Sequence, residues 1–291
     1  FQPSRIEKST PTIIITTSFS AMHMELDRYR PGYLVYTDKH ALMTSDGTTT
    51  HVIAGNSTQA GYREGVGADA RFDRITGFAQ ISEKLVVVAD YYNQCMRLID
   101  RTTHNTSAFS GQCESRGYEG GRPGQFFYPR SVVIDKRDKN QLLITDERNA
   151  AVRTVDVMSQ LVDTFLKSDS FKDLKDITQE EKSGDLYLTA RHAVYRIKYV
   201  EKTVSLISGY GSGYGGGTLL ESLFNWPLEL TFIRPETLLV ADYNNNKLRL
   251  LEMKSDSVTT LNVTNLLSRP TSLLLTNDSL YVGQYKKIFQ C

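Results

Sequence analysis

A repeat runs through the whole of this 291-residue chain and limits the folds open to it. In three strong copies an Asp is followed three positions later by Asn, and four positions after that by Arg. The three sets are Asp90, Asn93 and Arg97; Asp146, Asn149 and Arg153; and Asp242, Asn245 and Arg249. Self-similarity at a period of about 20–50 residues is typical of solenoids and propellers.

Three weaker copies occupy the rest of the chain. Asp38 keeps the marker Asp without the Asn and Arg, whereas Ala190 and Gln284 stand where Asp is expected. The six markers lie at positions 38, 90, 146, 190, 242 and 284, so neighbouring markers are separated by 42 to 56 residues.

Each repeat is expected to form four short strands. In the second repeat, apolar β-forming runs at 77–81, 85–89, 95–99 and 106–110 are separated by turn residues. Helical periodicity is absent, apart from an ambiguous stretch near 169–176. The pattern predicts an all-β fold, namely a six-bladed β-propeller of four-stranded antiparallel blades.

The two ends of the chain are expected to meet in one blade. The last repeat holds about three strands, and the run Thr12–Thr17 has no place in the first repeat. Pairing the two would remove two exposed sheet edges, so deleting residues 1–18 should destabilise the ring. We expect one domain over 1–291, with blades at about 19–55, 66–113, 125–168, 171–209, 222–262 and 268–291 plus 11–18.

These repeats resemble the NHL-repeat family. The resemblance rests on the V-A-D-x-x-N turn, the Arg that follows it, the Gly-rich lead-in at 61–72 and the aromatic steps before Pro129 and Pro227. It is strong in the second, third and fifth blades and partial in the others. The resemblance implies a six-bladed ring.

We expect the Asp, Asn and Arg of the repeat to be structural. A carboxylate at a strand end accepts hydrogen bonds from the following turn, Asn tolerates left-handed backbone there, and Arg can pair with an acid. The alternative is that these residues line a ligand-binding mouth.

Two of the three cysteines are predicted to form a disulfide. Cys95 lies in a third strand and Cys113 near the end of the fourth, on either side of a turn centred on His104. Opposed residues of such a hairpin are about as far apart as a disulfide requires. Cys291 is left over, either free or paired with a segment outside this chain.

The composition points outside the cytosol. The sequence contains four N-glycosylation patterns, and disulfides persist in oxidising compartments. No apolar run approaches the roughly 20 residues of a membrane span, so we expect no membrane insertion. Because the chain begins at Phe1, we interpret it as part of a larger secreted or membrane-anchored protein. The glycosylation candidates are Asn56, Asn105, Asn262 and Asn277.

Catalytic residues, metal ligands and cofactor sites are not recognisable. The five histidines lack ligand spacing, and the glycine run at 211–216 leads into another blade rather than a helix. We therefore predict no enzyme and no cofactor. A metal-dependent propeller lyase or hydrolase, with ligands from separate blades around a channel, stays an alternative.

The charge pattern makes a nucleic-acid partner the less favoured one. The net charge is +1, and the basic runs at 136–139, 191–198 and 286–287 are short and far apart in the chain. Some NHL propellers bind RNA, so an RNA-binding module is a second alternative.

Tyrosine is abundant, with 16 copies, several of them in expected loops. Tyrosine suits recognition surfaces, although Gly-Tyr steps also fill grooves between blades. The leading hypothesis is a non-enzymatic extracellular module that binds a protein through loops on one face, with a glycan as the less favoured ligand. The candidate binding residues are Tyr62, Tyr91, Tyr92, Tyr118 and Tyr243.

Overall fold

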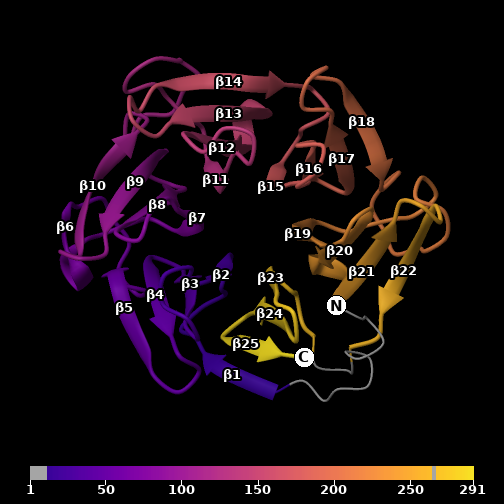
Figure 1. The fold of residues 1–291 in the computed structure, drawn as a ribbon, viewed down its shortest axis with the longest axis horizontal. Coiled ribbons are helices and arrows are strands. Elements are labelled where there is room, and N and C mark those ends of the chain that lie inside the picture. Colours follow the sequence, from indigo (N-terminus) through magenta and orange to yellow (C-terminus); the bar gives the residue numbers. More distant parts are fainter. Residues whose placement is uncertain (1–11, 264–266) are drawn as a thin grey trace. The chain divides into compact units, whose positions relative to one another are not determined.

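A computed structural model describes residues 12–263 and 267–291. The strands form six antiparallel sheets, so the chain is a six-bladed β-propeller of four-stranded blades, and the expected fold class is confirmed (Figure 1). The ambiguous stretch near 169–176 is not helical. The chain divides into two compact units, residues 18–174 (the N-terminal unit) and residues 1–17 with 175–291 (the C-terminal unit).

The N-terminal unit holds three sheets. The first consists of β2 (Met24–Leu26), β3 (Leu34–Asp38), β4 (Ala41–Ser45) and β5 (Thr50–Gly55). The second consists of β7 (Ile75–Gln80), β8 (Leu85–Asp90), β9 (Cys95–Asp100) and β10 (Asn105–Ser110), with a short fifth strand β6 (Gly65–Val66) beyond β10. The third consists of β11 (Pro129–Ile134), β12 (Gln141–Asp146), β13 (Ala151–Asp156) and β14 (Val162–Lys167).

The C-terminal unit holds the other three sheets. The fourth blade consists of β15 (Leu174–Gln179), β16 (Leu186–Ala190), β17 (Ala193–Ile197) and β18 (Val204–Ser208). The fifth consists of β19 (Pro227–Arg234), β20 (Thr237–Asp242), β21 (Lys247–Glu252) and β22 (Ser257–Leu261). The last consists of β23 (Ser272–Leu275), β24 (Leu280–Gln284), β25 (Lys287–Gln290) and β1 (Thr12–Thr16).

The N-terminal strand completes the last blade, as expected. β1 runs antiparallel to β25, with Thr12 opposite Gln290 and Thr16 opposite Lys287. Ile15 of β1 is buried, whereas Ile13 is 46% exposed. Residue 11, the first of the expected segment, lies outside the described residues.

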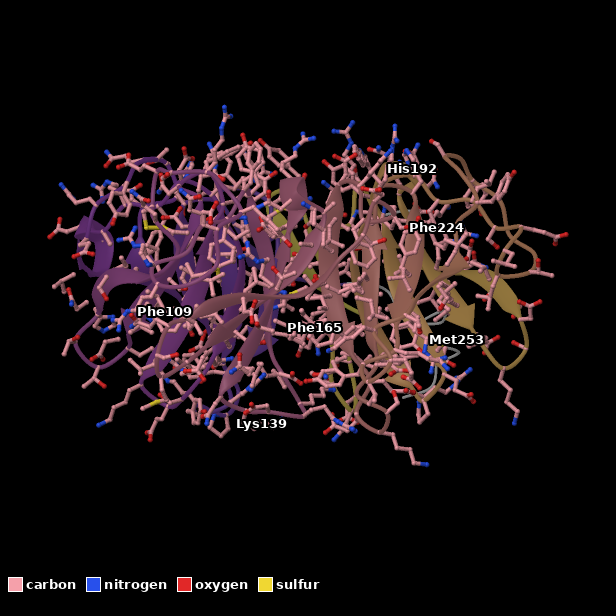
Figure 2. The ribbon with its side chains drawn as sticks, turned by 90° about the horizontal axis from the view of Figure 1, so that it is seen from above. Phe109, Lys139, Phe165, His192, Phe224 and Met253 are labelled. Atoms are coloured by element: carbon pink, nitrogen blue, oxygen red, sulfur yellow. A yellow bond between two sulfur atoms is a disulfide. The ribbon has the colours of Figure 1, made fainter. Side chains whose placement is uncertain are left out.

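The cores explain why the second strands are almost continuously apolar. β8 and β12 are buried along nearly their whole length. For β8 the reason is that alternate residues enter two core clusters of the N-terminal unit, so both faces of its sheet are covered. Figure 2 shows Phe109 in the interior of this unit and Lys139 at its edge; in the C-terminal unit Phe224 is interior and His192 lies at the edge.

The strand register shows which segments lie at the same end of a blade. Ile75, the first residue of β7, lies opposite Asp90, and Pro129 of β11 lies opposite Asp146. The segment that enters a blade and the turn after its second strand therefore share one end, the linker end.

Candidate interaction surface

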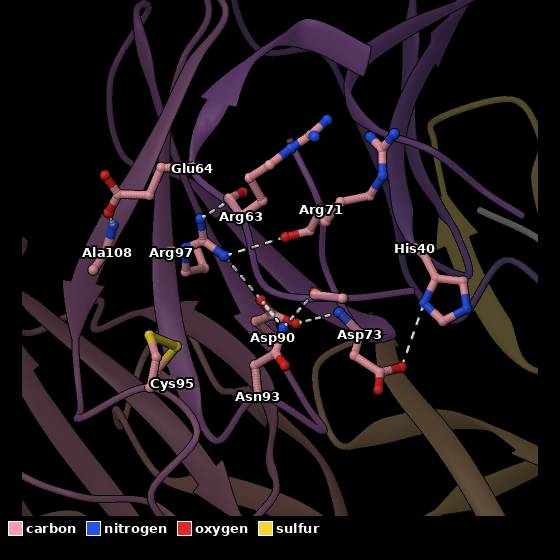
Figure 3. A network of polar contacts seen from close by, with 12 residues as sticks. His40, Arg63, Glu64, Arg71, Asp73, Asp90, Asn93, Cys95, Arg97 and Ala108 are labelled. Carbon is pink, nitrogen blue, oxygen red and sulfur yellow. Dashed lines mark hydrogen bonds and ion pairs between the residues drawn. A yellow bond between two sulfur atoms is a disulfide. The ribbon is translucent and has the colours of Figure 1, made fainter. Parts of the chain in front are cut away.

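The Asp, Asn and Arg of each strong repeat form a cluster, here called the clasp, in which the Asp and Arg are fully buried. Figure 3 shows the clasp of the second blade. In the second blade, the Asp90 carboxylate accepts hydrogen bonds from the backbone N–H of Asp73 at 2.7 Å and from Asn93 Nδ2 at 2.8 Å. Arg97 Nη1 donates to the same carboxylate at 3.2 Å, and both side chains of this ion pair are fully buried.

The clasp holds the linker that enters its blade. Asn93 Nδ2 donates to the carbonyl of Gly61 at 2.8 Å, and Arg97 donates to the carbonyls of Arg63 and Arg71. The third and fifth blades repeat this arrangement at Asp146, Asn149 and Arg153 and at Asp242, Asn245 and Arg249.

The weaker copies form only parts of the clasp. Asp38 accepts the backbone N–H groups of Ser18 and Phe19, and Gln284 accepts that of Ser268 through its amide oxygen. Ala190 has no side-chain acceptor. The fourth blade therefore lacks the side-chain acceptor that binds a backbone N–H of the entering segment in each of the other five blades.

Burial governs the ionisation of the clasp carboxylates. It raises the pKa of Asp90 and of Asp146 to about 6, while the hydrogen bonds from Asn93 and Asn149 and the paired arginines act in the opposite direction. The pKa of Asp242 is raised for the same reason. The three carboxylates thus bond to backbone N–H groups and to Asn and Arg side chains of their own unit.

Four of the five candidate tyrosines have an arginine over the ring, and for Tyr91 this is Arg130 at 5.9 Å from the ring centroid. Tyr62 packs on the guanidinium of Arg97 and Tyr118 on that of Arg153, each at 4.6 Å from the ring centroid. Tyr243 lies farther from its arginine, with the Arg269 guanidinium 5.7 Å from the ring. Tyr62 and Tyr118 are thus part of the clasp, where a ring over a buried cation is stabilising.

The clasped linkers also cover the outer strands of their blades. Gly65 of β6 pairs with Thr106 of β10, and Gly121 and Gly217 form bridges to Val162 of β14 and Val258 of β22. The linker into the fourth blade, residues 168–173, is much shorter, and no described segment pairs with the free edge of β18. Clasp and covered edge therefore occur together.

A disulfide joins Cys95 to Cys113, with 4.9 Å between their Cα atoms. The two do not face each other in the β9–β10 ladder, because a bulge places Met96 opposite Ser110 and Cys113 lies beyond it in the linker. The bridge thus ties the next linker to the second blade. Cys291 is a free, half-buried thiol whose pKa burial raises to about 11.

Four aromatic rings meet at the linker end between the second and third blades. This aromatic patch consists of Tyr91 and Tyr92, which follow β8, and Phe127 and Tyr128, which precede β11. Tyr91 and Tyr128 stack with their centroids 4.6 Å apart and their planes 14° apart, and Tyr92 meets both edge-on. Tyr91 is buried, whereas Tyr92 is 44% exposed.

The backbone around the patch is fixed. Tyr91 and Tyr92 donate their N–H groups to the carbonyls of Arg74 and Asp73, at 3.1 and 3.0 Å. Tyr128 has a φ of 63°, and its N–H donates to Gln94 Oε1 at 2.7 Å. A surface whose rings are held this way loses little conformational entropy on binding.

Charged side chains contact the aromatic patch both at buried positions and at the surface. The Tyr91 hydroxyl donates to Glu147 at 3.1 Å, and Arg130 Nη1 lies 3.4 Å from the same buried carboxylate. Burial raises the pKa of Tyr91, so the hydroxyl stays protonated. The exposed Arg116 stacks over Phe127 at 5.3 Å.

The same contact that fixes Tyr128 recurs one blade earlier with a histidine. His40 Nδ1 accepts the N–H of Arg74, another residue with positive φ, at 2.9 Å. His40 is buried, and burial lowers its pKa, while the nearby Asp73 acts in the opposite direction. Among the described residues, no group of three or more His, Cys, Asp or Glu side chains is arranged to hold a metal ion.

The four glycosylation candidates lie at the surface to different degrees. Asn105, Asn262 and Asn277 are exposed, and Asn56 is half-buried with its Oδ1 accepting hydrogen bonds from Thr58. Thr264, which completes the Asn262 pattern, lies outside the described residues.

The sequence analysis names Tyr91 and Tyr92 as candidate binding residues, which stays a prediction, and it does not single out Phe127, Tyr128 and Arg130, which the structure places beside them. The sequence does contain a signal for them. Phe127 and Tyr128 directly precede Pro129, the first residue of β11, and the start of a first strand lies at the same end of a propeller as the turn after the second strand of the preceding blade.

Comparison with solved structures finds the same fold at low sequence identity. An auxiliary nutrient binding protein from Bacteroides ovatus has a TM-score of 0.73 at 12% identity, over 96% of this chain and 75% of the other. One from Bacteroides thetaiotaomicron has a TM-score of 0.71 at 12% identity over the same shares. A chain of a nidogen/laminin complex has a TM-score of 0.62 at 11% identity, over 86% of this chain and 84% of the other.

These likenesses show the fold alone. No family model matches the chain, and no curated protein matches it.

Proposed function

We propose that this chain is a non-enzymatic binding module of a larger extracellular protein and that it recognises a protein partner through the aromatic patch. The patch carries the proposal, because an exposed tyrosine that packs against a buried, hydrogen-bonded tyrosine and two half-buried rings, beside arginines, has the composition of a binding hot spot. A glycan is the less favoured ligand.

Other observations support this proposal. The disulfide favours an oxidising compartment. Among the described residues, no helix is both long and apolar enough to cross a membrane. Two structural neighbours are named as nutrient binding proteins, and a third belongs to a complex of two proteins. We further propose that the blades are NHL repeats of one domain over residues 1–291.

A displayed-peptide library tests the patch. The immobilised wild-type protein is used for selection, and the enriched peptides are then measured against Tyr92→Ser and Met158→Ser. Met158, 80% exposed in the turn between β13 and β14, is the control because that turn lies at the opposite end of the third blade. We expect binding to be lost in Tyr92→Ser and kept in Met158→Ser. Peptides that bind all three proteins equally would refute the patch as the binding surface.

A further inference from the structure

The outer edge of the second blade exposes apolar side chains. β6 is the outermost described strand of that sheet, and its Val66 is 55% exposed. Val52 of the neighbouring β5 is 42% exposed, and the next residue, Ile53, has its carbonyl oxygen 3.2 Å from His104 Nδ1. Exposed apolar strand edges promote association between chains.

Asn105 lies directly against this edge. It is paired with Val66 in the antiparallel ladder between β10 and β6, and it is exposed. Side chains of directly opposed residues lie on the same face, with Cβ atoms about 4.5–5.5 Å apart. His104, which approaches β5, is the preceding residue. Anything attached to the Asn105 amide therefore begins beside Val66 and close to Val52.

Asn105 is also the first residue of an Asn-Thr-Ser pattern that a glycosyl transferase can use. In that reaction the amide nitrogen forms a bond to the anomeric carbon of a lipid-diphosphate-linked oligosaccharide. The bond from that carbon to the phosphate oxygen breaks, the lipid diphosphate leaves, and the amide loses one proton. Within the described part of the chain the Asn105 side chain makes no hydrogen bond, whereas the Asn56 side chain accepts two from Thr58.

We propose that Asn105 carries an N-linked glycan that covers the apolar edge formed by Val52 and Val66. The proposal rests on the extracellular location proposed above. Sugar rings have apolar faces that can lie on valine side chains and hydroxyl groups that keep the outer surface hydrated. The glycan occupies an edge that strand pairing leaves open.

Expression in glycosylating secretory cells tests the proposal. Glycopeptide mass spectrometry of the wild type should find a glycan on Asn105. Asn105→Gln and Ser107→Ala each remove the pattern, and we expect both to lower the monomer fraction in size-exclusion chromatography. Adding Val66→Ser to Asn105→Gln should restore the monomer, because the apolar side chain that the glycan covered is gone.

Asn277→Gln is the matched control. Asn277 lies in the turn between β23 and β24, and no large exposed apolar residue adjoins it in the described sequence, so its loss should leave the monomer fraction unchanged. An unmodified Asn105 beside other modified asparagines, or no rescue by Val66→Ser, would overturn the inference and leave the extracellular location standing. Absence of glycan from all four sites would overturn both, while the peptide-binding test of the patch stays independent.

Discussion

The buried Arg97–Asp90 ion pair is expected to make a large contribution to the free energy of unfolding. Arg97→Met leaves the Asp90 carboxylate buried without its cation, and breaking a buried pair in this way costs about 3–5 kcal/mol of unfolding free energy. Urea unfolding of wild type and variant measures the difference.

Arg234→Met is the control for that measurement. Arg234 forms an exposed ion pair with Glu252 at 2.5 Å, and exposed pairs contribute about 0–1 kcal/mol. Equal losses in the two variants would contradict the structural role of the clasp.

His40 makes the stability of the N-terminal unit depend on pH. Because burial lowers its pKa below 6.5, the unfolded chain binds the proton more readily, so this contribution is complete above pH 6.5 and is lost as the pH falls. Lys39, Asp73 and Arg74 are the charged groups near the imidazole.

His40→Gln should reduce that pH dependence, since Gln94 performs the same acceptor role in the next blade. The raised pKa values of Asp90 and Asp146 act with the opposite sign, removing stability as the pH rises from about 4 to 6. They are present in both proteins and cancel in the comparison. The measurement is the free energy of unfolding of both proteins from about pH 7 to 5. If it changes with pH equally in the wild type and in His40→Gln, His40 is not the source of the pH dependence.

Among the elements, β1 joins the N-terminal part of the chain to the C-terminal part by pairing with β25. Ile15→Asp places a carboxylate in a buried position, and we expect it to destabilise the last blade by several kcal/mol. Ile13→Asp, on the same strand but 46% exposed, should have a small effect. Limited proteolysis compares the two variants, and equal susceptibility would mean that β1 is not packed as described.

The uncovered β18 should exchange its amide hydrogens faster than the covered outer strands. Its free edge has no described partner, whereas β14 and β22 are bridged by Gly121 and Gly217. Hydrogen-exchange mass spectrometry of peptides covering 204–208, 162–167 and 257–261 measures this. Equal protection in all three strands would contradict the description of the edge.

The elements were predictable because strand runs, turn residues and the Asp–Asn–Arg spacing repeat along the chain. The disulfide was predictable as a pair, but its geometry was not, because the bulge beside Ser110 shifts the ladder. The role of Tyr62 and Tyr118 was equally hidden, since contact with a buried guanidinium depends on how a linker folds back.

At the scale of the whole molecule, the charge balance argues against tight RNA binding. The net charge is +1, and Arg196 within one of the basic runs is paired with Asp185. We expect a labelled single-stranded RNA to show no saturable binding in fluorescence anisotropy at physiological salt. Saturable, sequence-dependent binding would favour the RNA-binding alternative instead.

The aromatic patch could not be found from any one repeat. It arises where the turn of one blade meets the entry to the next, so its two adjacent pairs, 91–92 and 127–128, lie more than 30 residues apart in sequence. Only the packing of the second blade against the third brings the two pairs together. A sequence pattern examined one repeat at a time therefore does not reveal the patch.

The clasp has a consequence for engineering. Segments 56–74, 111–128 and 209–226 look like interchangeable surface loops, yet each is bonded through its carbonyls to an Asn and an Arg of the blade that it enters. Grafting one of them onto another propeller would require transplanting its host residues as well, so the natural unit of exchange is a blade together with the segment that precedes it.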